Sequence, residues 1–251
     1  MFYIDLSTME NNISKRFNTF CLISTLFLLV FSRTVHAQDS TIIRPPVTKK
    51  LQKYYKQIKD DSTKRMVELR SIIPGLLYDL RYASTENFMH RLMYPKNTSQ
   101  TFLRLPASLA LLKVQEELNS TGLGLKIFDA YRPYSVTEKF WELVRDERYV
   151  ANPARGSGHN RGIAIDLTIV TLKTGNELEM GTGFDNFSDT AHHNFTSLSA
   201  EILKNRQLLR SLMEKHGFKA LETEWWHYSL PDWNRFELLD IPFSQLGKHL
   251  K

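Results

Sequence analysis

Hydrophobic and polar positions alternate with two different periods along the chain, and together they predict a domain of mixed helices and strands. Apolar residues recur every three or four positions in residues 106–122 and 198–216, which is the spacing of a helix with one buried face. Short apolar runs at residues 125–130 and 163–170 are typical of strands, the second with several β-branched side chains. A last short strand is expected at residues 225–230.

The order of these elements decides between the fold classes. Strands and helices are interspersed without a regular strand–helix–strand rhythm, and no glycine-rich phosphate loop follows a strand. A further helix is expected from Ser135, because the letters SVTE fit a capping box in which Ser135 and Glu138 close the first turn. The pattern therefore predicts an α+β fold with a mostly antiparallel sheet flanked by helices.

The N-terminal residues have a pattern of their own. Lys15 and Arg16 precede an apolar run at residues 20–31, and small residues follow it, as in a secretory signal peptide. We expect a signal peptide over residues 1–37, and the acidic residues ahead of Lys15 make Met9 an alternative start. An uncleaved membrane anchor is the other interpretation, which is disfavoured because a span needs about 20 apolar residues. The protein is thus expected to be exported, to the bacterial periplasm, without stable membrane insertion after cleavage.

Composition and charge indicate how the mature chain is organised and which partners it is expected to have. After the signal peptide we expect a basic N-terminal extension over residues 38–65 and one domain over residues 66–251. The formal net charge is +6, and part of the excess lies in residues 49–59, which predicts either attraction to an anionic cell envelope or a solvated basic helix face. Export and the lack of a recognised motif argue against nucleic-acid binding. The only cysteine, Cys21, lies in the signal peptide, so we expect no disulfide in the mature chain.

The letters SGHNRGIAID at residues 157–166 hold the first candidate chemistry. His159 would lie in the loop that enters the strand, Gly162 would let that loop bend, and Asp166 would lie within the strand among apolar neighbours. A carboxylate in such surroundings is costly unless it is paired, and a metal ion would pair it. The spacing alone is also consistent with a turn histidine and an aspartate that backbone donors satisfy.

A second motif, ETEWWH, places Glu224 three residues before His227. A metal hydrolase needs nitrogen and oxygen ligands, an open position for water and a nearby carboxylate that is not a ligand. His159, Asp166 and His227 would supply the ligands. Glu224 would supply the base, provided that a bend or bulge brings it to the same side of the strand as His227. Otherwise the motif is a core tryptophan pair beside an incidental Glu and His.

A third motif, DAYRPYS, places Arg132 on a loop directly after the expected strand at residues 125–130. A fixed cation there would stabilise a carbonyl oxyanion, whereas an arginine without the other motifs would be a surface or ion-paired residue. His192 and His193 are competing metal ligands. Because adjacent histidines rarely both reach one ion, we expect these two to be structural.

Together with MGTGFD at residues 180–185, these motifs resemble the D-alanyl-D-alanine dipeptidases of the VanX type. Those proteins are zinc peptidases that share a fold with D,D-carboxypeptidases and the Hedgehog signalling domain. The resemblance covers residues 78–230 with the motifs in the same order, and residues 78–88 are similar to the family's N-terminal segment. It implies a Hedgehog/D,D-peptidase-like fold, one zinc ion per chain and hydrolysis of the D-Ala-D-Ala dipeptide in the cell envelope.

The resemblance also implies roles for single residues. His159, Asp166 and His227 would bind Zn²⁺. Glu224 would be the general base that takes a proton from water and delivers it to the leaving amine. Arg132 would stabilise the transition state.

Substrate contacts are implied for four further residues. Ser157 and Asp185 match positions that contact the substrate in the family, with Asp185 facing its free amino group. Phe184 and Asp185 would occupy the space that an acylated substrate needs. Tyr94 is the nearest candidate for a substrate-contacting tyrosine, although its spacing departs from the family pattern.

Two other functions remain as alternatives at this point. A zinc D,D-carboxypeptidase or endopeptidase that acts on peptidoglycan stem peptides would use the same chemistry. A Hedgehog-like zinc module that binds without hydrolysing is a different class, and Glu224 and Arg132 argue against it because a binding module needs neither a base nor an oxyanion partner.

Overall fold

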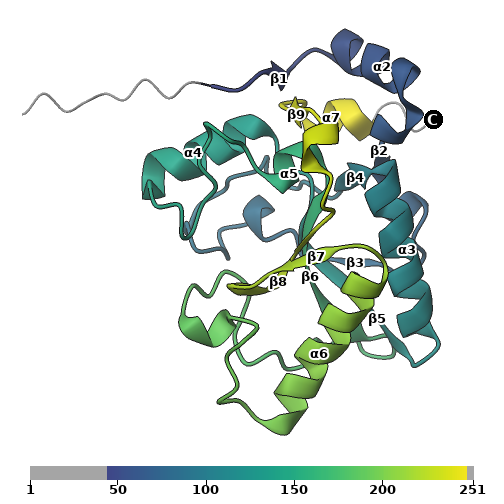
Figure 1. Ribbon diagram of the computed structural model, residues 1–251, viewed down its shortest axis with the longest axis vertical. Coiled ribbons are helices and arrows are strands. Elements are labelled where there is room, and N and C mark those ends of the chain that lie inside the picture. The colour runs from purple at the N-terminus through teal and green to yellow at the C-terminus, as the bar shows by residue number, and fades with distance from the viewer. Residues whose placement is uncertain (1–43, 248–251) are drawn as a thin grey trace, which may run out of the picture. The chain divides into compact units, whose positions relative to one another are not determined.

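The computed structural model describes residues 44–247 and shows a five-stranded sheet at their centre (Figure 1). The strand order is β3–β5–β6–β8–β7, and every pairing is antiparallel except that of β3 with β5. The strands are β3 (Leu77–Tyr78), β5 (Leu123–Asp129), β6 (Ala164–Thr171), β7 (Lys219–Leu221) and β8 (Glu224–Ser229). The predicted α+β class with a mostly antiparallel sheet is confirmed, and its three longest strands lie where the apolar pattern predicted them.

Two long helices, α3 (Leu105–Asn119) and α6 (Ala200–Lys215), pack on one face of this sheet (Figure 1). Their apolar sides form one core with alternate residues of β6: Leu111, Val114, Leu118, Leu209, Met213, Ile165, Leu167 and Ile169. Because side chains alternate along a strand, β6 turns the residues between these, including Asp166, to the opposite face. The helices cover the apolar face of the sheet, and the polar side chains such as Asp166 lie on the opposite face.

The one-turn helix α5 (Gly158–Arg161) packs against β6, and α4 (Tyr134–Val144) contributes Val136 and Phe140 to a second hydrophobic cluster that includes Tyr82. The capping box predicted at Ser135 is wrong, because α4 begins one residue earlier, after Pro133, and has no side-chain cap. The fixed φ of Pro133 prepares the first turn without one. The Ser135 N–H donates instead to Asp240 Oδ1 at 3.0 Å.

Smaller elements surround the sheet. β2 (Met66–Glu68) pairs antiparallel with β4 (Phe102–Arg104), and β1 (Val47–Thr48) pairs in parallel with β9 (Leu238–Leu239). Two more helices are α2 (Leu51–Asp60) and α7 (Phe243–Leu246). Five short 3-10 turns lie at Ser62–Lys64, Leu69–Ser71, Arg81–Ala83, Asp189–Ala191 and Trp233–Arg235.

The described part of the expected N-terminal extension folds against the rest. It contributes β1 and α2, and the buried hydroxyl of Tyr54 accepts a hydrogen bond from the Met66 N–H at 2.7 Å. The signal peptide expected at residues 1–37, with Cys21, lies outside the described residues, so these boundaries stay predictions. Over residues 44–247, no helix combines the length and apolar character that crossing a membrane requires.

Candidate metal centre and substrate cleft

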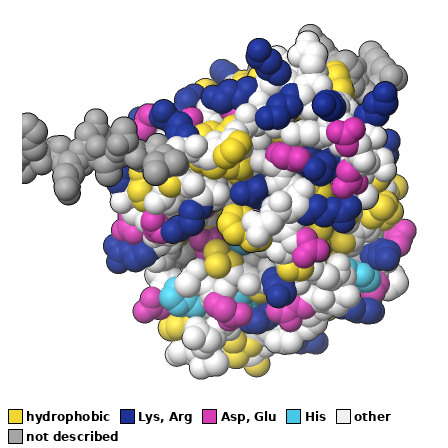
Figure 2. All heavy atoms as spheres, turned by 45° about the horizontal axis from the view of Figure 1, so that its top comes forward, with side chains coloured by type: hydrophobic (Ala, Val, Ile, Leu, Met, Phe, Trp, Pro, Cys, Tyr) yellow, Lys and Arg dark blue, Asp and Glu magenta, His cyan; other side chains and the backbone are white. Residues whose placement is uncertain are grey.

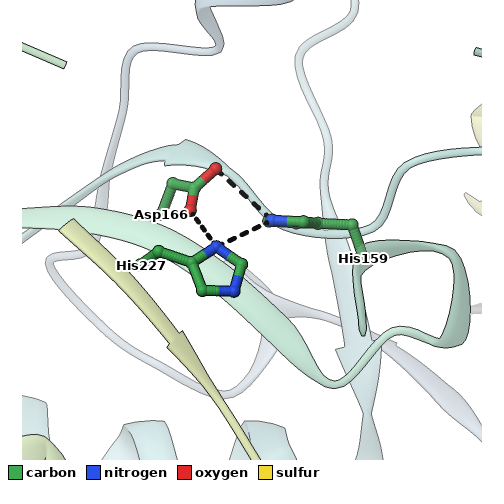
Figure 3. Close-up of side chains that lie close together, drawn as sticks. All are labelled: His159, Asp166 and His227. Atoms are coloured by element: carbon green, nitrogen blue, oxygen red, sulfur yellow. Dashed lines mark hydrogen bonds and ion pairs between the residues drawn. The ribbon is translucent and has the colours of Figure 1, made fainter. Parts of the chain in front are cut away.

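Three side chains from two neighbouring strands and one short helix converge on one point (Figure 3). Asp166 of β6 and His227 of β8 are direct cross-strand partners, and His159 reaches them from α5. His227 Nδ1 lies 2.9 Å from Asp166 Oδ1 and 3.3 Å from His159 Nε2, and His159 Nε2 lies 3.4 Å from Asp166 Oδ2. Among residues 44–247, this is the one group of three or more metal-ligating side chains whose ligand atoms all lie within 4.8 Å of one another.

Two residues of this donor group, His159 and Asp166, present lone pairs that suit the binding of a cation. His159 Nδ1 lies 2.7 Å from the carbonyl oxygen of Ala130, which can only accept, so Nε2 keeps a lone pair directed at the centre. Burial acts to raise the pKa of Asp166, but the two histidines outweigh it and hold that pKa below its usual range. Two imidazole nitrogens and a carboxylate oxygen are ligands that zinc takes at catalytic sites, where a fourth position stays open. The three residues therefore fit a zinc ion.

The one-turn helix α5 fixes the position of His159. Ser157 Oγ accepts from the Asn160 N–H at 3.2 Å, and Asn160 Oδ1 accepts from the Ser157 N–H at 3.0 Å, which completes a capping box. Gly162 ends the helix at a φ of 71°, in the left-handed region that favours glycine. The cap and this glycine together turn the chain from α5 directly into β6.

Glu224 lies at the start of β8, beside the donor group. Its Oε2 is 3.9 Å from His227 Nδ1. The register of β7 against β8 shifts between Ala220 and Leu221, and an irregularity at this place is what the ETEWWH spacing needs if Glu224 and His227 are to reach one site. Burial raises the pKa of Glu224 to about 7, the range that suits a general base near neutral pH.

Arg132 lines the same cleft and is held by a fully buried carboxylate. Its Nε and Nη2 donate to Asp129 Oδ2 at 3.0 and 2.7 Å. The guanidinium carbon lies 5.2 Å from the ring centre of Tyr82 and 4.9 Å from that of Phe140. Burial acts to lower the pKa of Arg132, but Asp129 outweighs it and keeps that pKa well above its usual value. Arg132 is thus a fixed cation.

Asp185 is a second carboxylate in the cleft, and it is partly buried. The Tyr82 hydroxyl lies 3.1 Å from both of its oxygens, and burial raises the pKa of Asp185 well above its ordinary value. The preceding residue, Phe184, stacks on Phe128 at 4.9 Å and meets Trp226 edge-on at 5.6 Å. Phe184 therefore supports the wall behind Asp185 and does not line the cleft itself.

A cleft of about 600 Å³ brings most of the predicted site residues together. Those that line it are His159, Asp166, His227, Glu224, Arg132, Ser157 and Asp185. Tyr94 does not line it, because its hydroxyl points to Asp129 Oδ1 and donates to it at 2.5 Å. Tyr94 borders a different cavity of about 650 Å³ next to Phe243, which contains none of the donor residues, so we place the site in the smaller cleft.

Two residues of this site were missed from the sequence. Tyr82 lines the cleft. The only feature of the sequence that pointed to Tyr82 was its position within residues 78–88. Asp129 opens the DAYRPYS motif, three residues before the arginine that it holds. His192 lines the cleft and His193 packs against Tyr228, and neither belongs to the donor group.

The known proteins to which this chain is similar are named as peptidases. A family model described as D-Ala-D-Ala dipeptidase, in the peptidase M15 group, matches residues 62–247. D-alanyl-D-alanine dipeptidase from Escherichia coli (strain K12) is 36% identical over 182 residues, which cover 72% of this chain and 93% of that protein. The protein of the same name from Enterococcus faecium is 33% identical, with 65% and 90% covered. A solved structure, VanYB in complex with D-alanine-D-alanine, aligns over 61% of this chain and 87% of its own at 12% identity and a TM-score of 0.36.

Proposed function

The chain belongs to the D-Ala-D-Ala dipeptidase family of M15 peptidases, and on this premise we propose that it hydrolyses the free dipeptide D-Ala-D-Ala with one bound zinc ion. The observation that carries the proposal is that four groups suited to peptide hydrolysis line the same cleft. A three-residue donor group, a partly buried carboxylate 3.9 Å from one of the donor atoms, a fixed arginine and a second partly buried carboxylate all line it. A metal-binding module without activity has no use for the last three groups.

Each group has a distinct task in peptide hydrolysis. A zinc ion held by His159, Asp166 and His227 would supply Lewis acidity, which would polarise the peptide carbonyl and make water more acidic. Glu224 takes a proton from the attacking water and passes it to the leaving amine, which suits a carboxylate placed beside the donor group but outside it. Arg132 donates hydrogen bonds to the carbonyl oxygen as negative charge develops. Because Asp129 already holds the guanidinium, little reorganisation is needed at that moment.

Asp185 supports the choice of a free dipeptide as substrate. The α-amino group of a dipeptide is cationic at neutral pH, and a partly buried carboxylate attracts it and fixes the position of the two residues. An N-acylated substrate has no such charge and leaves Asp185 with the Tyr82 hydroxyl but no cationic partner. Ser157 and Tyr82 line the same cleft and are the further substrate contacts in this proposal.

We place the reaction in the cell envelope. The basic residues, apolar run and small residues of the first 37 positions support export by a signal peptide.

A substrate comparison tests the proposal. The zinc-loaded protein should cleave free D-Ala-D-Ala and should cleave N-acetyl-D-Ala-D-Ala and a pentapeptide stem poorly. Asp185→Asn should lower kcat/KM for the free dipeptide about 30-fold or more, since it removes one partner of a buried charge pair. Asp189→Asn is the matched control, because Asp189 borders the same cleft with 93% of its side chain exposed, and it should change little. Equal turnover of the acetylated and the free dipeptide would replace the dipeptidase with the carboxypeptidase alternative.

A further inference from the structure

The positive charge of this protein is concentrated in one segment. Residues 44–65 contain eight Lys and Arg against two Asp, a formal charge of +6, which equals the charge of the whole chain. The remaining residues therefore carry 25 basic and 25 acidic side chains and have no net charge. In Figure 2, which brings the top of Figure 1 forward, Lys and Arg side chains gather on the upper part of the face, where α2 lies.

Three lysines of α2 form what we call the α2 basic face, Lys53, Lys56 and Lys59, and Lys50 precedes them at the N-cap. All four are exposed, and none lies within 4.0 Å of a carboxylate in the described part of the chain. Like charges three residues apart on a helix repel, and lysines near a helix N-terminus oppose its dipole. The helix has no acidic residue in its first turn to offset them. Lys50 and Lys53 at the N-terminal end therefore work against helix stability, and a role in α2 itself does not explain them, whereas Lys59 in the last turn suits the helix dipole.

The fold nevertheless holds this face rigidly. Tyr54 of α2 is buried and hydrogen-bonded to the Met66 backbone, and the Gln57 side chain donates to Thr48 Oγ1 at 3.0 Å. Thr48 is part of β1, which pairs with β9. The ammonium groups of this face are thus displayed from a packed helix and not from a free tail.

We propose that the α2 basic face binds the headgroups of an anionic phospholipid bilayer. Twelve residues separate the apolar run at residues 20–31 from Arg44, so the basic segment lies close in the sequence to the run that would engage a membrane in the export that we propose. Tyr55, 37% exposed, lies among the lysines, and aromatic rings favour the headgroup level of a bilayer. No residue of 44–65 lines the cleft, so binding through α2 leaves the cleft uncovered.

Vesicle partitioning tests this proposal independently of hydrolysis. The full chain is mixed with vesicles of phosphatidylcholine alone or of phosphatidylcholine with phosphatidylglycerol, and the ratio of the two partition coefficients is measured. This ratio cancels any binding by the apolar run, which does not depend on lipid charge. Replacing Lys53, Lys56 and Lys59 by Gln should lower the ratio about 10²-fold. Salt at about 1 M, where the Debye length is about 3 Å, should remove the preference of the parent chain.

A second triple variant provides the matched control. Lys113→Gln, Lys173→Gln and Lys204→Gln remove the same charge from exposed lysines outside the basic segment, and this variant should keep a larger ratio than the α2 variant. Neither variant should melt below the parent, and both should keep its dipeptide turnover. Equal ratios for the two variants would overturn the proposal, as would a parent chain with no preference for anionic vesicles. Retention of that parent chain by an insoluble wall fraction would then indicate a wall polymer as the partner.

Discussion

Replacing Asp129 by Asn should destabilise the protein far more than the loss of an ordinary surface ion pair. Asp129 is fully buried and accepts two hydrogen bonds from Arg132 and one from the Tyr94 hydroxyl. The amide keeps the shape of the carboxylate but not its charge, so the Arg132 guanidinium is left buried without its counterion. Breaking one side of a buried pair costs about 3–5 kcal/mol. For a chain of this size, that corresponds to a drop in Tm of about 6–20 °C.

An exposed ion pair of the same length supplies the control. Arg81 Nε lies 2.7 Å from Asp79 Oδ2, the distance that also separates Arg132 Nη2 from Asp129 Oδ2, but the Arg81 and Asp79 side chains are 32% and 40% exposed. Exposed pairs contribute about 0–1 kcal/mol, so Asp79→Asn should shift Tm by a few degrees at most. The two pairs have the same shortest distance, so the contrast between the variants reports burial together with the additional hydrogen bonds that Asp129 accepts.

The assay is thermal and urea unfolding at saturating zinc, followed by two spectroscopic probes, with steady-state kinetics on the same samples. Asp129→Asn should also lower kcat more than it changes KM, because Arg132 acts on the charge that develops in the transition state. A free energy of unfolding within about 1 kcal/mol of that of Asp79→Asn would refute the reasoning, since the median surface pair is worth no more than this. In that case Arg132 would not depend on Asp129 for its charge.

Four further outcomes follow from the site and its surroundings. The parent should bind about one equivalent of zinc, and a protein with both His227→Ala and Asp166→Ala that retained it would contradict the donor assignment. Glu224→Gln should keep the zinc and lose at least about 10²-fold in kcat, and near-normal turnover would exclude it as the base. Arg132→Ala should lose about 10²–10³-fold in kcat, with a smaller change in KM. Burial lowers the pKa of His193 to about 4 from an ordinary 6.5, so the unfolded chain binds the extra proton between these values and stability falls as pH drops through that window. Urea midpoints of His193→Gln should fall less steeply there, and identical pH profiles would rule out this contribution.

The sheet and the donor group were predictable because their signals are local. Ile165, Leu167 and Ile169 alternate with other residues of β6, and this alternation fixes both the strand and the side on which Asp166 emerges. His159 lies one short turn before that strand. The ligands and the base therefore sit in two compact motifs, whose meeting requires only that β6 and β8 are neighbours.

Contacts between distant segments left no such signal. Tyr82 and Asp185 are 103 residues apart in the sequence, and Tyr94 and Asp129 are 35 residues apart. The sequence around each residue therefore does not predict these two hydrogen bonds. Tyr94 was expected at the substrate because it is the nearest downstream tyrosine, yet the structure turns its hydroxyl to Asp129. The start of α4 was misplaced for a related reason, since Pro133 and a contact from Asp240 decide where it begins.

The direct pairing of Asp166 with His227 has a consequence for folding. A slip of β8 by one residue against β6 turns His227 to the opposite face of the sheet, so only the native register brings both ligands to one side. A metal ion at this site would therefore bind chains in which β6 and β8 pair in the native register and would not bind chains in which they have slipped. At a free concentration one hundred times its dissociation constant, it would favour the native register by about 2.7 kcal/mol. The yield of correctly paired protein would then follow the zinc supply of the compartment in which the chain folds.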